Sequence, residues 1–379
     1  MLNLKPSWIF ISNTNIRKAK GGWDGLGFKI FELLERNYEI NLLDNIDPKL
    51  SIYSKISNKI IRILGFKSNF HFFSNRRLKK IASIFSEQQS NKNSILFFHG
   101  STPWSLINPG CPYFVLLDCT FKNYISVYHD DSLFSESDLK RIGFLDKRFL
   151  LSAEKVFFTS NYALNEAING YNLVGDNFIN IGQGPGVEFV ESEYDSSIKK
   201  KQLLFVASDF LGKGGLTIFN AFTKFSNFYP DYKLIVVGQR PPTFVLSNDN
   251  VVYMGYIDKS NEDGLNLLSR LYSESWFLLL LSTKDIAPLV LIDAGMLYCP
   301  SISLNTGAVD ELIVDCETGY ILKSNTVECL FNVLISAAEQ TQLEYDKLCV
   351  NVYDYMVNNH NWKLTEKKLV QSINESIQK

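Results

Sequence analysis

Short apolar runs alternate along the chain with longer segments in which apolar positions recur at helical spacing. The runs are apolar nearly throughout, as expected for parallel strands that are covered on both faces. In the first half of the chain they lie at 8–12, 38–43, 94–98, 113–118, 155–160 and 178–181. Helical spacing occurs between them at 26–36, 76–85 and 161–171. This alternation predicts an α/β fold with a doubly wound sheet.

The strand series is interrupted at 187–201, a polar and charged segment that we interpret as an interdomain linker. Further apolar runs follow at 203–208, 232–238, 250–254, 276–281 and 301–304. The pattern therefore predicts two Rossmann-like domains, over 1–188 and 201–355, followed by a terminal segment, 356–379, with an amphipathic helix at 362–378. Two such domains that face each other form a central cleft, which is the expected ligand site.

Composition narrows the class of protein. Hydrophobic residues make up 46% and charged residues 21%, and the formal net charge of −2 argues against nucleic acid as a partner. Six cysteines form no C-x-x-C pair, so we expect reduced thiols in a cytoplasmic protein, without a zinc site. The strongest apolar run, 276–281, is far shorter than the ~18 residues of a membrane span.

A lysine lies in a glycine-containing turn of the second half. Residues 205–222 have the pattern of strand, turn and helix, with Lys213 in the turn and Gly214 and Gly215 opening the helix. A lysine beside a helix N-terminus suits a diphosphate, since backbone N–H groups and a point charge act together. The alternative is a solvated turn lysine. The P-loop spacing G-x-x-x-x-G-K-S/T is absent.

Two aspartates, Asp285 and Asp293, lie eight positions apart in the segment 283–322. We expect Asp285 in a strand-to-helix turn and Asp293 one or two turns into the helix. Carboxylates suit vicinal diols because they accept two hydrogen bonds at once, so one could bind a sugar and the other a ribose. The alternatives are a helix N-cap for Asp285 and a solvated helix position for Asp293.

In the first half, His99 closes the apolar run 94–98 and Asp118 closes the run 113–118. If the sheet is parallel, both strand ends point to the cleft. Both residues are therefore candidates for the site. For His99, a structural role with bonds to nearby backbone remains an equal alternative.

The motifs occur in an order that resembles glycosyltransferase family 4. In the second half these are KGG (213–215), VVGQRPP (236–242), GYIDK (255–259), the D-x7-D of Asp285 and Asp293, TGAVDELI (306–313) and ETGYIL (317–322). In the first half, KGGWDGLG (20–27) and GQGPGVE (182–188) fit in order. The family has the GT-B fold, in which two doubly wound domains face a central cleft and the last helix crosses back onto the first domain.

The resemblance implies a role for each matching residue. Lys213 would neutralise the donor diphosphate, Asp285 would contact the transferred sugar and Asp293 would hold the ribose. Asp118 occupies the place of a family histidine near the sugar. The other residues expected to bind the nucleotide sugar are Gly22, Gly214, Gly238, Ile257, Leu289 and Val290.

The activity implied is transfer of a sugar, with retention of configuration, from a nucleotide sugar to a glycan or lipid-linked acceptor. No metal and no other cofactor is expected, because lysine and helix N–H groups can stabilise the leaving diphosphate. Two alternatives remain open. One is a non-catalytic GT-B subunit that binds a partner, and the other is a nucleotide-sugar epimerase.

Residues 49–80 are basic. No Asp or Glu lies between Asp47 and Glu87, whereas nine Lys and Arg residues are interleaved with Ile, Leu and Phe. Such a stretch suits an anionic membrane surface or a phosphate-bearing lipid, which favours a cytoplasmic protein peripheral at the inner face of the membrane. The alternative is a pair of ordinary helices with a solvated basic face.

Overall fold

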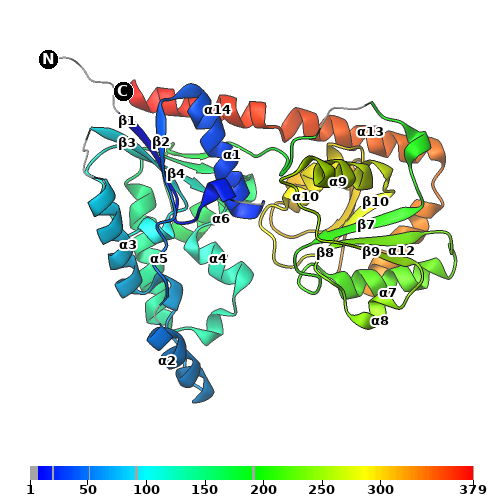
Figure 1. Cartoon of the computed structure of the whole chain (residues 1–379), viewed down its shortest axis with the longest axis horizontal. Helices are drawn as coiled ribbons and strands as arrows, with labels where there is room; N and C mark the ends of the chain where they lie inside the picture. The colour runs from blue at the N-terminus through cyan, green and yellow to red at the C-terminus, as the bar shows by residue number, and fades with distance from the viewer. Residues whose placement is uncertain (1–6, 19–20, 51, 90–92, 190–192, 379) are drawn as a thin grey trace. The chain divides into compact units, whose positions relative to one another are not determined.

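The computed structural model describes residues 7–18, 21–50, 52–89, 93–189 and 193–378, without the side chains of 53–55. Its contacts divide the chain into two compact units (Figure 1). The first unit consists of residues 1–182 and 365–379, and the second of residues 183–364.

The first unit contains six parallel strands with helices on both faces (Figure 1). The strands are β1 (Ser7–Ile11), β2 (Ile40–Leu43), β3 (Ser94–His99), β4 (Tyr113–Leu117), β5 (Lys155–Phe158) and β6 (Phe178–Asn180). The helices are α1 (Gly22–Asn37), α2 (Ile52–Ile63), α3 (Asn75–Gln88), α4 (Phe121–Tyr128), α5 (Glu136–Leu151), α6 (Asn161–Tyr171) and the greater part of α14 (Trp362–Ile377). The predicted strands and helices of this half are confirmed, while α2, α4 and α5 were not predicted as separate elements.

The first sheet has the order β2-β1-β3-β4-β5-β6, and every pairing in it is parallel. One face packs against α3, α5 and α6 through buried side chains such as Ile81, Phe149 and Ala167. On the sheet itself, Phe10 stacks on Phe97 with ring centroids 5.4 Å apart. The inner strands β3, β4 and β5 are buried almost throughout, which explains why their apolar runs do not alternate with polar residues, whereas the edge strand β2 is only partly buried.

The second unit repeats this architecture. Its strands are β7 (Gln202–Ala207), β8 (Lys233–Gly238), β9 (Val251–Gly255), β10 (Phe277–Leu280), β11 (Ser301–Leu304) and β12 (Gly319–Leu322). Its helices are α7 (Gly215–Ser226), α8 (Thr243–Leu246), α9 (Glu262–Glu274), α10 (Leu289–Gly295), α11 (Val309–Leu312), α12 (Val327–Ala338) and α13 (Gln342–Asn359).

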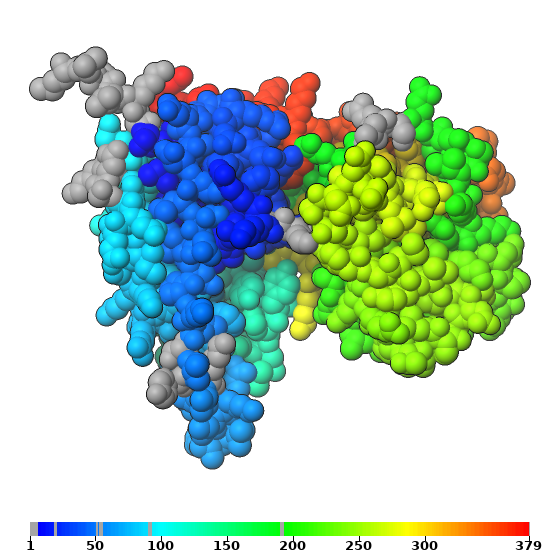
Figure 2. All heavy atoms as spheres, viewed as in Figure 1, coloured from blue at the N-terminus to red at the C-terminus, as the bar shows by residue number. Residues whose placement is uncertain are grey.

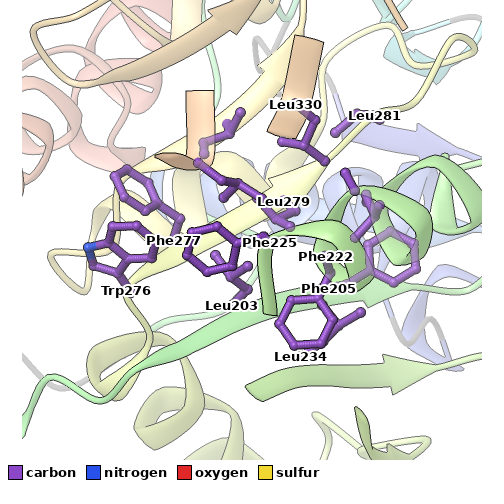
Figure 3. Packing of buried hydrophobic residues seen from close by; sticks show 14 of the residues in the cluster. Leu203, Phe205, Phe222, Phe225, Leu234, Trp276, Phe277, Leu279, Leu281 and Leu330 are labelled. Carbon is purple, nitrogen blue, oxygen red and sulfur yellow. The ribbon is translucent and has the colours of Figure 1, made fainter. Parts of the chain in front are cut away.

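The second sheet has the order β12-β11-β10-β7-β8-β9 and is also parallel throughout. Its larger core lies between the sheet and helices α7, α12 and α13, where Leu203, Phe225 and Phe277 are fully buried (Figure 3). The edge strand β12 was not predicted, because it is short and its two middle residues are only partly buried.

The segment predicted as a linker packs on the second unit in its described part. Lys199 Nζ donates to the carbonyls of Ser275 and Tyr298, at 3.1 and 2.7 Å, and Tyr194 lies beside Tyr298. Residues 190–192 of that segment lie outside the described residues. The compact units divide after Gly182, whereas the sequence suggested a first domain that ends at 188 and a terminal segment that begins at 356. From Gln183 on, the motif GQGPGVE is therefore part of the second unit.

Among the described residues, no helix has the length and apolar character needed to cross a membrane. All six cysteines are free thiols.

Candidate functional site

The strand order of the second sheet reverses between β7 and β10. From β7 the chain proceeds to β8 and β9 on one side, and from β10 it proceeds to β11 and β12 on the other. Since all strands are parallel, the loops after β7 and β10 leave the same edge of the sheet and diverge there. Such a switch point is where open α/β sheets bind ligands.

The turn after β7 is fixed by its neighbours. The N–H of Phe210 donates to Oε1 of Gln239 at 2.6 Å, so the loop after β8 holds the turn. The carbonyl of Lys213 accepts the N–H of Leu281 at 3.2 Å. Gly214 caps α7 with φ 82°, and a Cβ there would lie 2.6 Å from the carbonyl oxygen of Leu281. Only glycine fits this position, and the backbone of Lys213 is thereby tied to the end of β10.

Lys213 and Asp285 meet at the switch point. Nζ of Lys213 lies 2.5 Å from Oδ1 of Asp285, and the two side chains are 24% and 16% exposed. The other carboxylate oxygen, Oδ2, is buried and has no hydrogen-bond partner among the described atoms. Because a buried unpaired acceptor is costly, this oxygen has the properties of a binding position for a hydroxyl donor. The alternative that Asp285 caps a helix is wrong, since Pro288 occupies the N-cap of α10.

Asp293 is buried, with 1% of its surface exposed. Its Oδ1 accepts the N–H of Gly186 at 2.7 Å, and its Oδ2 lies 3.4 Å from Nζ of Lys259. Burial raises the pKa of Asp293, and the Lys259 charge and the Gly186 N–H oppose that rise. The alternative of a solvated helix residue is therefore wrong. In this structure the carboxylate fastens the segment after Gln183 to α10.

The remaining predicted residues of the second unit lie along the same edge. Leu289 and Val290 are the first two residues of α10, so their N–H groups have no partner within the helix. Gly238 ends β8, and its carbonyl accepts the hydroxyl of Tyr253 at 3.0 Å. The side chain of Ile257 is buried in the core beside α9, which leaves only its backbone for a ligand.

The first sheet has its own switch point, between β1 and β3, and His99 lies there. The imidazole is fully buried, with Nδ1 3.2 Å from Oγ of Ser12, and it stacks on Trp23 at 4.2 Å between ring centroids. A Cβ at Gly27 would lie 2.5 Å from Nε2. Burial lowers the pKa of His99 to about 3, so the ring is neutral. The ring contacts favour the structural alternative for His99, although Nε2, which faces Gly27, has no hydrogen-bond partner among the described atoms.

Asp118 follows β4 and is partly exposed. Burial raises the pKa of its carboxyl to about 6, while hydrogen bonds with Cys119 oppose the rise. Gly22 begins α1 and has open space around it. Lys20, at the start of the same glycine motif, lies outside the described residues.

Sequence reasoning missed three residues that organise these edges. Asp146 is fully buried in the first unit and accepts four hydrogen bonds, from Ser101, Thr102, Phe121 and Tyr171. It stands on a helix whose pattern gave no sign of a buried acid. Gln239 and Lys259 lie inside the motifs VVGQRPP and GYIDK, and their place in those motifs was the available signal. The described residues contain no group of three or more His, Cys, Asp or Glu that could hold a metal ion.

Comparison with known structures identifies the fold as GT-B. Sucrose-phosphate synthase from Thermosynechococcus elongatus superposes with a TM-score of 0.70 at 14% identity, over 98% of each chain. The HepE protein of Anabaena, in complex with UDP and glucose, gives 0.67 at 13% identity, over 97% of this chain and 99% of that one. A glycosyltransferase from Rickettsia africae gives 0.63 at 14% identity, over 98% and 99%.

A family match adds to the fold. Residues 188–351 match the family described as Glycosyl transferases group 1, and this region lies wholly within the second unit. No curated protein matches the sequence. The predicted two-domain α/β architecture is thus confirmed, and the matched region contains the Lys213–Asp285 pair.

Proposed function

We propose that the protein is a retaining, family 4-like hexosyltransferase that uses a nucleotide-sugar donor and a glycan or lipid-linked acceptor. The observation that carries the proposal is the pairing of Lys213 with Asp285 at the switch point of the second sheet, with Oδ2 of Asp285 buried and unpaired. The group 1 match over the same residues supports it. The similar Anabaena structure was solved with UDP and glucose, which are a nucleotide diphosphate and a hexose, the two parts of such a donor.

In the proposed reaction the bond between the anomeric carbon and the donor diphosphate breaks, and a bond to an acceptor hydroxyl oxygen forms. Negative charge grows on the diphosphate as it leaves. Lys213 stabilises that charge, together with the backbone N–H groups of Leu289 and Val290, and a fixed cation and dipoles do so without reorganisation. The acceptor proton passes to a phosphate oxygen of the leaving group. No step assigns a role to a metal ion.

The two aspartates take different parts in the proposal. Asp285 binds a hydroxyl of the transferred sugar through Oδ2, which has no other partner among the described residues. Asp293 binds the ribose after one of its carboxylate oxygens loses its contact with Gly186 or Lys259. Gly22 and Asp118 are proposed to contribute from the first unit, and Gly214, Gly238 and Ile257 to shape the nucleotide site through their backbone.

The test is turnover of UDP-, GDP- and ADP-glucose in the presence of EDTA, measured as release of the nucleotide diphosphate. One of the three donors should be consumed when an oligosaccharide or lipid-linked acceptor is supplied, and proton NMR of the glycoside that forms should show the donor's anomeric configuration. Inversion would contradict the retaining mechanism. Consumption only after a divalent ion is restored would contradict metal independence.

A second candidate is a non-catalytic GT-B subunit. Contacts within the second unit favour this candidate. Asp285 already neutralises the charge of Lys213, and both carboxylate oxygens of Asp293 already have partners. This candidate predicts a folded protein that releases no nucleotide diphosphate from any of the three donors.

A further inference from the structure

Helix α2 exposes an apolar face. The four isoleucines of this face are spaced four, four and three residues apart, which places them on one side of the helix. They are Ile52, Ile56, Ile60 and Ile63, with exposed fractions of 71%, 53%, 51% and 74%. Leu64 and Phe66 continue the apolar surface beyond the helix, at 65% and 69% exposure. We call these six residues the α2 surface.

The helix is held to the first unit by its other side. Nδ2 of Asn58 donates to the carbonyl of Asn69 at 2.9 Å, and Nε of Arg62 donates to Oγ of Ser68 at 2.9 Å. The Arg62 guanidinium also lies 4.9 Å from the ring centroid of Phe134. In Figures 1 and 2, α2 projects beyond the other elements of its unit. The isoleucines on its apolar face are therefore exposed and are not packed in a hydrophobic core of this unit.

Positive charge accompanies the α2 surface. Residues 48–86 contain nine Lys and Arg and no Asp or Glu, although the whole chain carries a formal charge of −2. Seven of these basic residues are exposed in the structure: Lys49, Lys59, Arg62, Lys67, Arg76, Lys79 and Lys80. A second copy of the chain would bring the same positive charge against this face, so the charge opposes self-association.

We infer that the α2 surface docks the protein on an anionic lipid bilayer. Aliphatic side chains on one face of a helix enter the boundary between headgroups and acyl chains, and flanking lysines contact anionic headgroups. Four isoleucines and the surrounding cations provide both contributions. The inference does not depend on the proposed transfer reaction, because vesicle binding is measured without a donor or an acceptor.

The experiment is flotation of the full chain with vesicles of phosphatidylcholine alone and of phosphatidylcholine with 30% phosphatidylglycerol, a mole fraction of about one third chosen to give a strongly anionic surface. Wild type should float with the anionic vesicles and lose binding at high salt. Ile56→Glu/Ile60→Glu should reduce the partition coefficient by roughly tenfold or more. Lys59→Glu and Lys67→Glu should each reduce it about fivefold or more. Val174→Glu, at an apolar position of the same unit that is 88% exposed, is the matched control and should bind as wild type.

Three results would overturn the inference: no flotation of wild type with anionic vesicles, equal flotation with neutral vesicles, or unchanged flotation of Ile56→Glu/Ile60→Glu. Dimerisation that this double variant abolishes, without vesicle binding, would assign the surface to a second copy instead. The thermal midpoint of the variant checks its folding. If it has unfolded, the two lysine variants decide the question alone.

Discussion

The two switch points of the molecule differ in what covers them. In the second unit, Lys213 and Asp285 are partly exposed, and Oδ2 of Asp285 has no partner among the described atoms. In the first unit, His99 lies at the equivalent position and its Nε2 also has no partner among the described atoms, but the whole ring is buried under Trp23 and against Gly27. The topology provides the same position twice. The residues that pack over it decide whether a polar side chain can meet a ligand.

The largest effect that follows from this contrast is on turnover in the second unit. Lys213→Ala should reduce turnover by about two to three orders of magnitude, because the cation proposed to stabilise the leaving diphosphate is lost. Steady-state release of the nucleotide diphosphate measures it. Lys224→Ala, which breaks an exposed ion pair with Glu328 elsewhere in the unit, is the control and should keep turnover. Equal turnover in the two variants would show that Lys213 has no special role, and the switch point of the second unit would then not be the catalytic site.

Asp285→Asn separates binding from transfer. Removal of the carboxylate frees Lys213 from its partner, so we expect a nucleotide diphosphate to bind more tightly than to wild type, by severalfold. Turnover should fall by about a hundredfold if Asp285 holds the transferred sugar. Calorimetry with the free nucleotide and a turnover assay measure the two effects. Weaker binding of the free nucleotide would show that Asp285 does not compete for Lys213.

The raised pKa of Asp118 in the first unit predicts that its effect on stability depends on pH. Its pKa is raised to about 6 in the folded protein and is near 3.8 when unfolded, so the folded state binds the proton more tightly. The contribution of Asp118 to stability is therefore complete below about pH 4 and is lost as the pH rises through 6. Asp118→Asn should be more stable than wild type at pH 7, by up to about 3 kcal/mol, and lose this advantage near pH 4.

The pH dependence of urea unfolding for both proteins measures this effect. Taking the difference between them removes the contributions of Asp146 and Asp293, whose pKa values are also raised by burial. A difference that does not change with pH would contradict the burial of Asp118.

Gly27 tests how tightly His99 is covered. Gly27→Ala places a Cβ 2.5 Å from Nε2 of His99, and the stacked Trp23 restricts movement of the ring. We expect a loss of about 1–3 kcal/mol in the free energy of unfolding. Gly25→Ala on the same helix meets nothing within 4 Å and should be neutral or slightly stabilising. The penalty should shrink in a His99→Ala background, and an unchanged penalty would exclude His99 as its cause.

The smallest expected effect concerns Gln239, which holds the turn of Lys213 without touching the pair. Gln239→Leu removes the acceptor for the N–H of Phe210 and should lower turnover about fivefold or more, whereas Gln239→Glu keeps an oxygen and should retain activity. A merely structural role would move the thermal midpoint of both variants without separating their turnover.

The sequence predicted the two-sheet architecture because fully buried parallel strands leave continuous apolar runs. It missed β12, an edge strand with two half-buried residues, and the helices α4 and α5, and it included α2 only in the alternative of two helices over 49–80. The proximity of Lys213 and Asp285 followed from topology, since they lie in the loops that follow two adjacent strands of one parallel sheet. The burial of His99 could not be predicted, because it depends on Gly27 and Trp23 approaching from α1. The hydrogen bond from the N–H of Gly186 to Asp293 could not be predicted either, because the two residues lie about a hundred positions apart in the sequence.

The most direct test of the central claim is calorimetric titration of UDP, GDP and ADP, in EDTA, into wild type and Lys213→Ala. One nucleotide diphosphate should bind wild type, and its affinity for the variant should be at least about tenfold lower, because a diphosphate loses its only assigned side-chain cation. Equal affinity of the two proteins for that nucleotide, or no binding of any nucleotide to wild type, would contradict the assignment of the Lys213–Asp285 pair as the donor site.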